Sequence, residues 1–156
     1  MRLKDFLCSQ AIIADLKANN KTEVIEELVM LMINAGVIEK KSKAKIIDVL
    51  MAREALGSTA IGQGVAIPHG KSDSVTQLTA GLGISKKGIN FDSLDGEPAY
   101  IFFLLLAPVD SAGPHLKALA RVSRLLKDKY IRESLKAVKD KKDILELINQ
   151  EDARVS

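Results

Sequence analysis

Two histidines are the residues of this sequence that could carry reactive chemistry. His69 follows an aliphatic run that Pro68 ends, and Gly70 comes directly after it. This arrangement predicts a loop at the end of a strand, where rigid scaffolds commonly display functional groups. His115 follows Pro114 at the predicted start of a helix, where free backbone N–H groups can help to hold an anion. Imidazole has an ordinary pKa of about 6.5, so near neutral pH it is largely an unprotonated nucleophile.

Residue type alone leaves a simpler interpretation open, in which these residues have structural roles only. His69 could belong to a turn without a function, and His115 could be a half-buried structural histidine. Arg53, at the end of a predicted helix, could do no more than complement the negative end of the helix dipole. Choosing between the two interpretations needs a longer pattern than single residues.

Several familiar sites are excluded by the residues that stand in their motifs. The segment Gly57–Gly62 begins like a phosphate-binding P-loop, but Gln63-Gly64 stands where Lys-Ser/Thr is needed. A dinucleotide-binding loop would need a third glycine where this chain has Ile67. The two histidines and the one cysteine lie too far apart for a structural zinc site. The sequence therefore predicts neither a nucleotide cofactor nor a metal ion.

Composition indicates one ordinary globular domain over residues 1–156. Hydrophobic residues make up 47% of the chain, charged residues 28%, and the net charge is +3. The basic clusters Lys40–Lys45 and Lys136–Lys142 fit solvated helix faces, and no stacking aromatics alternate with them, so nucleic-acid binding is not predicted. Cys8 is the single cysteine, which excludes an intramolecular disulfide, fits a reducing compartment and favours a packing role.

No segment has the pattern of a signal peptide or a transmembrane helix. The first residues, Met1–Gln10, carry charges and no long apolar run. The most hydrophobic stretch, Tyr100–Ala107, is far shorter than the ~20 residues that span a bilayer. We therefore expect a cytoplasmic protein without membrane insertion.

Helical patterns occupy the first third of the chain, after a segment Ala11–Leu16 that could be a strand or the end of a small helix. Asn20 and Glu23 form a capping-box pattern. The helix that follows has an apolar face at helical spacing, made of Ile25, Leu28, Val29 and Met32, and Gly36 is placed to end it. A second helix is predicted over Ser42–Glu54, with Gly57 after it and with Ile46, Ile47 and Leu50 facing inward.

Strands are predicted in the middle of the chain and helices again at its end. The expected strands are Ala60–Ile67, Leu78–Ile84, Ile89–Phe91 and Tyr100–Ala107, with a tight turn at Asp95-Gly96 and a stop at Pro108. The next helix, with Pro114 in its first turn, should bury Leu116, Leu119, Ala120 and Ser123. Asp128 and Asp140 are placed to cap two further helices, whose inward residues are Ile131, Leu135, Ile144, Leu147 and Ile148. This order predicts an α/β fold in which helices flank a small mixed sheet.

A longer pattern extends from Glu54 to Gly70. After Glu54, six residues lead to Ile61-Gly62, and two free positions then precede Val65-Ala66-Ile67-Pro68-His69-Gly70. This segment resembles the phosphorylation-site motif of the fructose/mannitol-type (type 2) enzyme IIA family of the bacterial phosphotransferase system. The resemblance covers nearly the whole chain, through Arg53–Thr59, Phe91–Pro98, the apolar strand that follows, and the helix that begins near His115-Leu116. Pro114 departs from the family pattern and removes a backbone donor beside His115.

The resemblance implies a phosphohistidine carrier that needs no metal or cofactor. His69 would accept a phosphoryl group from an HPr-like phosphocarrier and donate it to an enzyme IIB domain. His115 would be the second histidine of the site, and Arg53 the basic residue near the phosphate. The protein could serve sugar uptake or act as a nitrogen-regulatory IIA that signals to target proteins. A third alternative is a non-catalytic binding module of the same fold, in which His69 is only structural.

Overall fold

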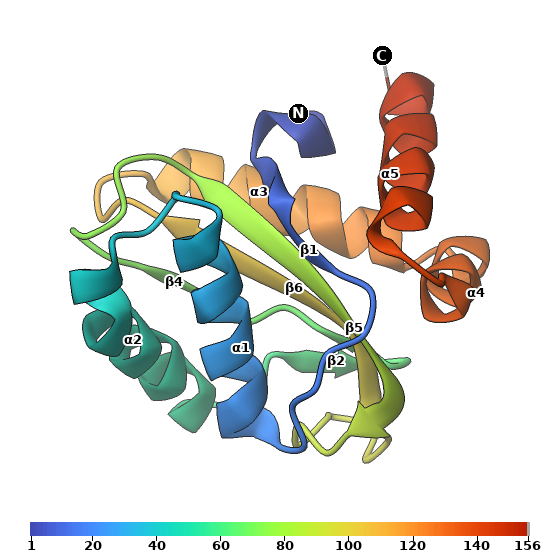
Figure 1. The fold of residues 1–156 in the computed structure, drawn as a ribbon, viewed down its shortest axis with the longest axis horizontal. Helices are drawn as coiled ribbons and strands as arrows, with labels where there is room; N and C mark the ends of the chain where they lie inside the picture. The colour runs from blue at the N-terminus through green and yellow to red at the C-terminus, as the bar shows by residue number, and fades with distance from the viewer. Residues whose placement is uncertain (156) are drawn as a thin grey trace.

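Two long antiparallel strands, β5 (Thr79–Ile89) and β6 (Ala99–Ala107), form the centre of a mixed sheet. The computed structural model describes residues 1–155. Strand β1 (Leu7–Ile13) runs parallel to β5, while β3 (Val65–Ala66) and β4 (His69–Lys71) both run parallel to the other side of β6. Strand β2 (Ala60–Gly62) pairs antiparallel with β3, so the sheet order is β1-β5-β6-β3-β2, with β4 beside β6 (Figure 1).

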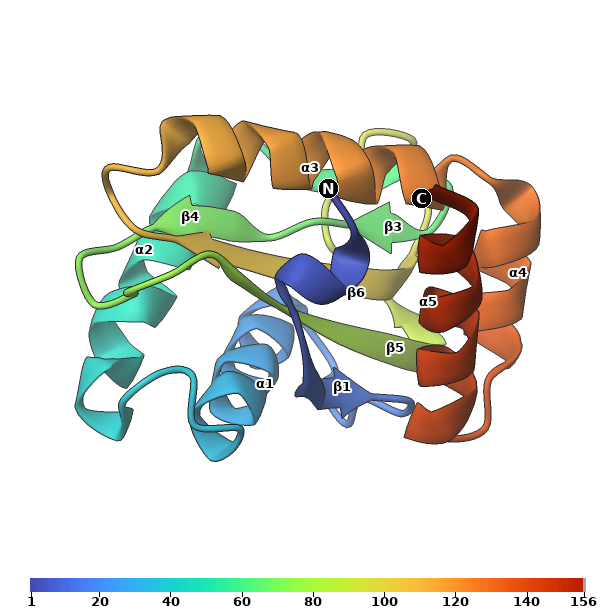
Figure 2. The ribbon, with the colours of Figure 1, turned by 90° about the horizontal axis from the view of Figure 1, so that it is seen from above.

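Helices cover both faces of the sheet. In Figure 1, α1 (Lys21–Asn34) and α2 (Lys43–Ala55) lie on the lower left side of the sheet, and α3 (Ala112–Leu126) lies on the opposite, upper side. The helices α4 (Lys129–Ala137) and α5 (Lys141–Val155) complete the layer that contains α3 (Figure 2). Two short 3₁₀ turns, η1 (Leu3–Asp5) and η2 (Lys40–Ser42), were not predicted. The predicted α/β fold with a mixed, helix-flanked sheet is confirmed.

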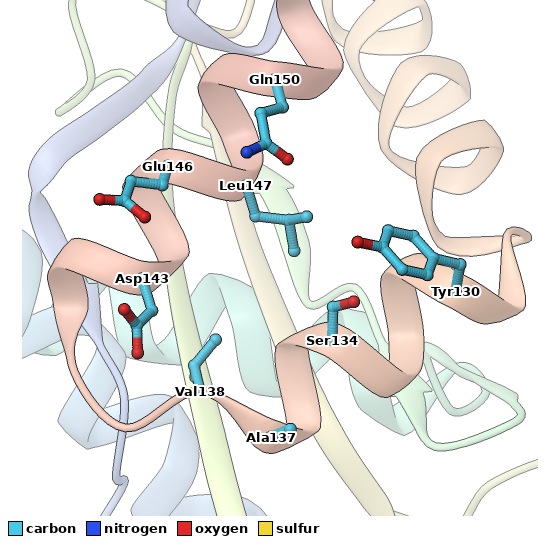
Figure 3. Close-up of a pocket in the computed structure, with 8 residues that line it drawn as sticks. All are labelled: Tyr130, Ser134, Ala137, Val138, Asp143, Glu146, Leu147 and Gln150. Carbon is cyan, nitrogen blue, oxygen red and sulfur yellow. The ribbon is translucent and has the colours of Figure 1, made fainter.

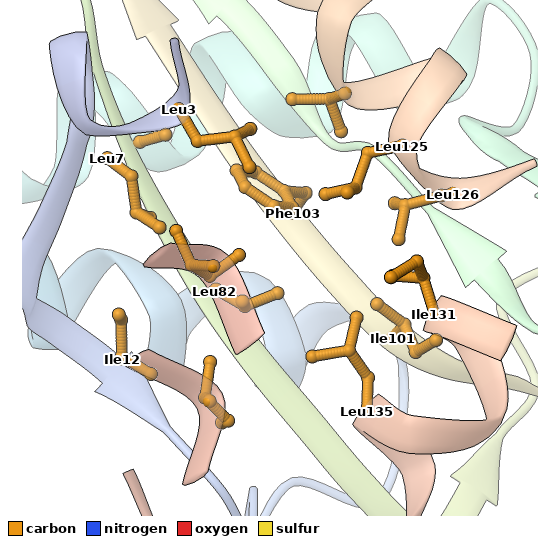
Figure 4. Packing of buried hydrophobic residues seen from close by; sticks show 14 of the residues in the cluster. Leu3, Leu7, Ile12, Leu82, Ile101, Phe103, Leu125, Leu126, Ile131 and Leu135 are labelled. Atoms are coloured by element: carbon orange, nitrogen blue, oxygen red, sulfur yellow. The ribbon is translucent and has the colours of Figure 1, made fainter. Parts of the chain in front are cut away.

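Strand β6 shows why both layers are needed. Its side chains alternate between the two faces of the sheet, as in any strand. Ile101, Phe103 and Leu105 belong to the core on the side of α3, α4 and α5 (Figure 4), whereas Phe102, Leu104 and Leu106 belong to the core on the side of α1 and α2. These six side chains are fully buried. The continuous apolar run therefore is a strand covered on both faces, as its sequence predicted.

Most helix ends follow the predicted capping. The Asn20 side chain accepts a hydrogen bond from the Glu23 N–H at 2.9 Å, and Asp128 and Asp140 cap α4 and α5 in the same way. The capping box at α1 is incomplete, because the Glu23 carboxylate accepts from the N–H of Asn19 and not from that of Asn20. That bond still satisfies a backbone donor just before the helix, so the change affects the detail of the cap and not its position.

The predicted strand Ala60–Ile67 is wrong in detail, because it is a tight hairpin of β2 and β3. Gln63 and Gly64 form its turn with φ values of +58° and +81°. Two consecutive residues in the left-handed region produce the turn geometry that matches the twist of a β-hairpin. Ile89–Phe91 is not a separate strand either, because β5 continues to Ile89, and β1 begins at Leu7, earlier than the predicted Ala11.

The predicted buried face of α3 is also wrong. Leu116 is 67% exposed and Ala120 is exposed, whereas the inward face consists of His115, Ala118, Arg121, Val122, Leu125 and Leu126. The true face is centred more than 100° around the helix from the predicted one. Two polar residues, His115 and Arg121, occupy inward positions, and a search for apolar periodicity cannot recognise them. Leu116 is thereby left at the surface, beside the cleft described below.

Within residues 1–155 no helix is long and apolar enough to cross a membrane.

Candidate active site

His69 is the first residue of β4, which corrects the prediction that it lies on a loop. Strands β3 and β4 follow the same side of β6, with His69 opposite Leu105, and the break between them falls at Ile67-Pro68. Proline has no N–H to give to a sheet ladder, so the strand is interrupted at that point. The Pro68 carbonyl still accepts a hydrogen bond from the Leu105 N–H at 2.9 Å, which fixes the backbone directly before His69.

The His69 ring is held in one tautomer. Its Nδ1 lies 2.7 Å from the carbonyl oxygen of Ile67. A carbonyl oxygen only accepts hydrogen bonds, so we assign the ring proton to Nδ1, which leaves the lone pair on Nε2. Burial lowers the pKa of His69 below 6.5; the Ile67 hydrogen bond opposes this effect, and the positive charge of Arg53 adds to it. Near neutral pH His69 is therefore an uncharged imidazole with a nucleophilic Nε2.

His115 lies against His69 from the start of α3. The two ring centroids are 5.6 Å apart and the rings meet edge to face at 80°. His115 is 6% exposed, and its Nε2 is buried without a hydrogen-bond partner within residues 1–155. Burial lowers the pKa of His115, and repulsion from His69 and Lys71 lowers it further. A neutral His115 can therefore offer its ring N–H to a bound group.

Pro114 does not disturb the position of His115. It is the third residue of α3, where a backbone N–H has no partner inside the helix. The His115 N–H makes a helical hydrogen bond with the Ser111 carbonyl, at 3.0 Å. The departure from the family pattern at Pro114 thus removes no bond that the helix needs.

We expect both histidines to titrate below 6.5, the ordinary pKa of imidazole. As the pH falls below 6.5 the unfolded chain binds protons before the folded chain does, so the free energy of unfolding should decrease. This contribution to stability is fully present above pH 6.5. NMR titration of the ring signals would measure both midpoints, with His69→Gln assigning the two sets. A midpoint at or above 6.5 for either ring would contradict the burial argument for that ring.

Arg53 reaches the same place because α2 packs directly on the backbone of β4. A Cβ atom at Gly70 would lie 2.8 Å from Cγ1 of Val49, which is closer than real contacts allow. Glycine at position 70 therefore permits the close approach, and Arg53 lies one helical turn beyond Val49. The Arg53 side chain is half-buried, and its Nη1 donates to the Gly57 carbonyl at 2.8 Å. It thus caps the end of α2 and also lines the cleft beside His69.

Glu54, the acidic residue of the motif, fixes the end of α2. Its buried carboxylate pairs with Lys21 at 3.1 Å and accepts hydrogen bonds from the N–H and the hydroxyl of Thr59. Lys21 also pairs with Asp92, at 3.1 Å. Through these contacts the C-terminal end of α2 is held against two segments. One is the loop that leads to β2, and the other is the start of α1. Glu54 is therefore a positioning residue for the segment that carries Arg53.

A cleft of about 630 Å³ opens between α2 and α3, with β4 at its floor. Figure 2 shows the C-terminal end of α2 approaching the start of α3 near β4. The cleft contains Arg53, His69 and His115, the three residues that the resemblance named, and it is otherwise mostly apolar. Its lining consists of Val49, Ala52, Arg53, Leu56, His69, Gly70, Lys71, Ala112, His115, Leu116 and Leu119.

Sequence reasoning missed Lys71, Leu56 and Leu116 as residues of this cleft. Lys71 follows His69 by two positions, so a strand over 69–71 would have placed both side chains on one face. The two leucines are 86% and 67% exposed at the rim. Large apolar side chains in open solvent are a signal of contact with a partner, but exposure cannot be read from the sequence.

Other hollows lack comparable chemistry. One of about 320 Å³ between α4 and α5 contains no histidine (Figure 3) and is lined by Tyr130, Ser134, Ala137, Val138, Asp143, Glu146, Leu147 and Gln150. Among residues 1–155 no group of three or more His, Cys, Asp or Glu side chains is arranged to hold a metal ion. The cleft around His69 is therefore the candidate active site.

Comparisons with a family model and with known proteins give matches over nearly the whole chain. Residues 5–151 match the family model described as "Phosphoenolpyruvate-dependent sugar phosphotransferase system, EIIA 2". A nitrogen regulatory protein of Bradyrhizobium diazoefficiens is 38% identical over 148 residues, which are 95% of each chain. The fructose-specific EIIABC component of Bacillus subtilis is 35% identical over 97% of this chain, which corresponds to 24% of that longer protein.

Solved structures show the same fold. The nitrogen regulatory protein IIA-Ntr of Neisseria meningitidis superimposes with a TM-score of 0.82 at 34% identity, over 92% of this chain and 97% of that one. The mannitol enzyme IIA of Escherichia coli, determined in complex with phosphorylated enzyme IIB, gives a TM-score of 0.75 at 21% identity, over 90% and 95% of the two chains. At that identity the second comparison concerns the fold alone.

Proposed function

Because this chain belongs to the EIIA 2 family of the phosphoenolpyruvate-dependent sugar phosphotransferase system, we propose that it accepts a phosphoryl group on Nε2 of His69 and passes it to a partner protein. The observation that carries this proposal is the hydrogen bond between Nδ1 of His69 and the Ile67 carbonyl. It leaves Nε2 unprotonated in a cleft that also contains Arg53 and His115. We infer that residues 1–156 act as one domain, in the cytoplasm.

The transfer step needs only groups that this chain and its donor supply. Nε2 of His69 attacks the phosphorus of a phosphohistidine on the donor, a new N–P bond forms, and the donor's N–P bond breaks with its electron pair returning to the donor imidazole. The His69 ring keeps its proton on Nδ1 and becomes positively charged, which strengthens its hydrogen bond to Ile67. In the onward transfer the acceptor attacks the phosphorus, a new bond to the acceptor forms, and the N–P bond of His69 breaks with its electron pair returning to Nε2.

The transition state of phosphoryl transfer is loose and anionic, so hydrogen-bond donors in fixed positions stabilise it. Arg53 offers a planar fork of N–H donors and a permanent positive charge. His115 offers its unpartnered Nε2. Within residues 1–155 no side chain caps the N-terminus of α3, and its first residue, Ala112, lines the cleft, so the positive end of the helix dipole lies nearby.

An HPr-like phosphocarrier is the proposed donor, and an enzyme IIB domain or a regulatory target is the proposed acceptor. Leu56 and Leu116 form an exposed apolar rim on opposite sides of the cleft, which suits brief contact with one partner after another. The mannitol enzyme IIA with this fold forms a complex with phosphorylated IIB. Similarity to a nitrogen regulatory protein over 95% of the chain favours the regulatory role, while the fructose-specific relative supports a role in uptake.

Incubation with phosphoenolpyruvate, enzyme I and HPr tests the proposal directly. We expect one acid-labile phosphoryl group per chain, and ¹⁵N–³¹P coupling in the labelled protein should place it on Nε2 of a histidine. Addition of a cognate IIB should then remove it. A chain that stays unlabelled with active donor proteins would instead be a non-catalytic binding module of this fold.

A further inference from the structure

A small basic pocket lies on α3, between this helix and the start of the chain. It has a volume of about 200 Å³ and is lined by Met1, Lys117, Ala120, Arg121 and Arg124. Lys117, Arg121 and Arg124 are spaced by four and three residues, which places them on one side of the helix. Figures 1 and 2 both show the N-terminal turn beside α3. None of the three cations lines the cleft around His69.

Within the part of the chain that the structure describes, Arg121 lacks some of the hydrogen bonds that its guanidinium could make. It is 6% exposed, and its nearest carboxylate oxygen, on Asp152, lies 3.7 Å from Nη2, which is too far for a hydrogen bond. The two Asp152 oxygens instead accept from the N–H groups of Leu3, at 2.7 Å, and Lys4, at 3.0 Å. Among residues 1–155, Nε and Nη2 of Arg121 thus find no hydrogen-bond acceptor, although both atoms are buried. Such donors are costly unless a partner is supplied.

The charge of the pocket is also unbalanced. Asp152 is the carboxylate that faces Arg121, and it comes from α5. Lys117 and Arg124 are exposed, and among residues 1–155 neither has an acidic side chain within 4.0 Å. In the described residues, these three cations thus share one carboxylate. The other two lining residues are Met1 and Ala120, so the pocket offers no large apolar surface to a protein partner.

We propose that this pocket binds a small polyphosphate anion, of the class of inorganic pyrophosphate. Guanidinium groups match phosphate oxygens with two parallel hydrogen bonds, and an anion with several charges can meet Arg124, Lys117 and the buried Arg121 together. Binding would give the unpaired donors of Arg121 an acceptor after a small movement of its side chain. The site depends on α3 and the N-terminal turn and does not depend on phosphorylation of His69.

The test is titration of the full chain with pyrophosphate at constant ionic strength, with the Arg Nε–H signals followed by NMR. At ~150 mM salt, where the screening length is ~8 Å, we expect saturable shifts of the Arg121 signal. Lys117→Ala and Arg124→Ala should each weaken binding by about tenfold, because each removes one charge-assisted contact. Lys129→Ala, which removes an exposed charge on α4, is the matched control and should bind as the unmodified chain does.

Two further measurements distinguish binding in this pocket from binding in the cleft around His69 and from unselective binding of anions. Arg53→Ala should leave the shifts of Arg121 unchanged, because Arg53 lines the cleft around His69 and not the pocket on α3. Succinate, a dicarboxylate, should bind more weakly than pyrophosphate. Equal response to both anions, linear shifts without saturation, or unchanged affinity in Lys117→Ala and Arg124→Ala would overturn the proposal. Phosphoryl transfer to His69 can succeed or fail without affecting any of these results.

Discussion

His69→Ala is expected to abolish labelling by phospho-HPr while leaving the fold intact. The substitution removes Nε2 of His69, the unprotonated nitrogen that the Ile67 hydrogen bond leaves in the cleft with Arg53 and His115. The backbone of β4 would still pair with Leu105 and its neighbours, so the sheet does not depend on the imidazole. Since the ring is only half-buried, we expect the free energy of unfolding to change by about 1 kcal/mol. Labelling is measured after transfer from radioactive phosphoenolpyruvate.

His115→Ala is the matched control for that experiment. It removes the other imidazole of the pair, which lies on a different element and is more deeply buried. The labelled residue should remain, although labelling should be slower. If His69→Ala were labelled as fully as the unmodified chain, or if His115→Ala alone lost the label, the assignment of the phosphoacceptor would be wrong.

Sequence patterns predicted the layers of this fold well because its longer elements have consistent periodicity. Helix α1 has its apolar residues at helical spacing, and β6 is apolar on both faces. Strand β4 could not be predicted in this way. Its three residues, His69–Lys71, contain no apolar alternation, and they become a strand only because β6 offers them a free edge. Pairing between distant segments is information that local patterns do not contain.

The candidate site also depends on contacts between distant segments, which the sequence pattern does not reveal. The motif identified His69, and the resemblance added Arg53 and His115, but nothing in their spacing says that the three meet. Their meeting depends on Gly70, which lets α2 approach β4, and on an inward-facing histidine in α3. Residues whose exposure decides their role, such as Leu56 and Leu116, require the structure. The roles in phosphoryl transfer that we assign to His69, His115 and Arg53 stay predictions until the variants are measured.

Arg53→Lys is expected to slow phosphoryl transfer strongly although it keeps the positive charge. Lysine cannot present two parallel N–H donors to phosphate oxygens, so the charge remains while the fork is lost. On the scale measured for single oxyanion donors, such a loss raises the transfer barrier by ~2–4 kcal/mol. Rapid-quench experiments should show this slowing both from phospho-HPr to this chain and from this chain to IIB, because the proposed contact of Arg53 is with the phosphoryl group during transfer.

The competing explanation for Arg53 is that it only caps α2 through its bond to the Gly57 carbonyl. Arg132 provides a matched control, since its Nη1 donates to the carbonyls of Leu126 and Lys127 at the end of α3, away from the cleft. If Arg53 stabilises the transferring group, Arg53→Lys slows transfer and Arg132→Lys does not, even where both lower the melting temperature equally. If capping is its whole role, the two variants lose similar stability and both transfer at the unmodified rate, and His69 must then work without the arginine fork.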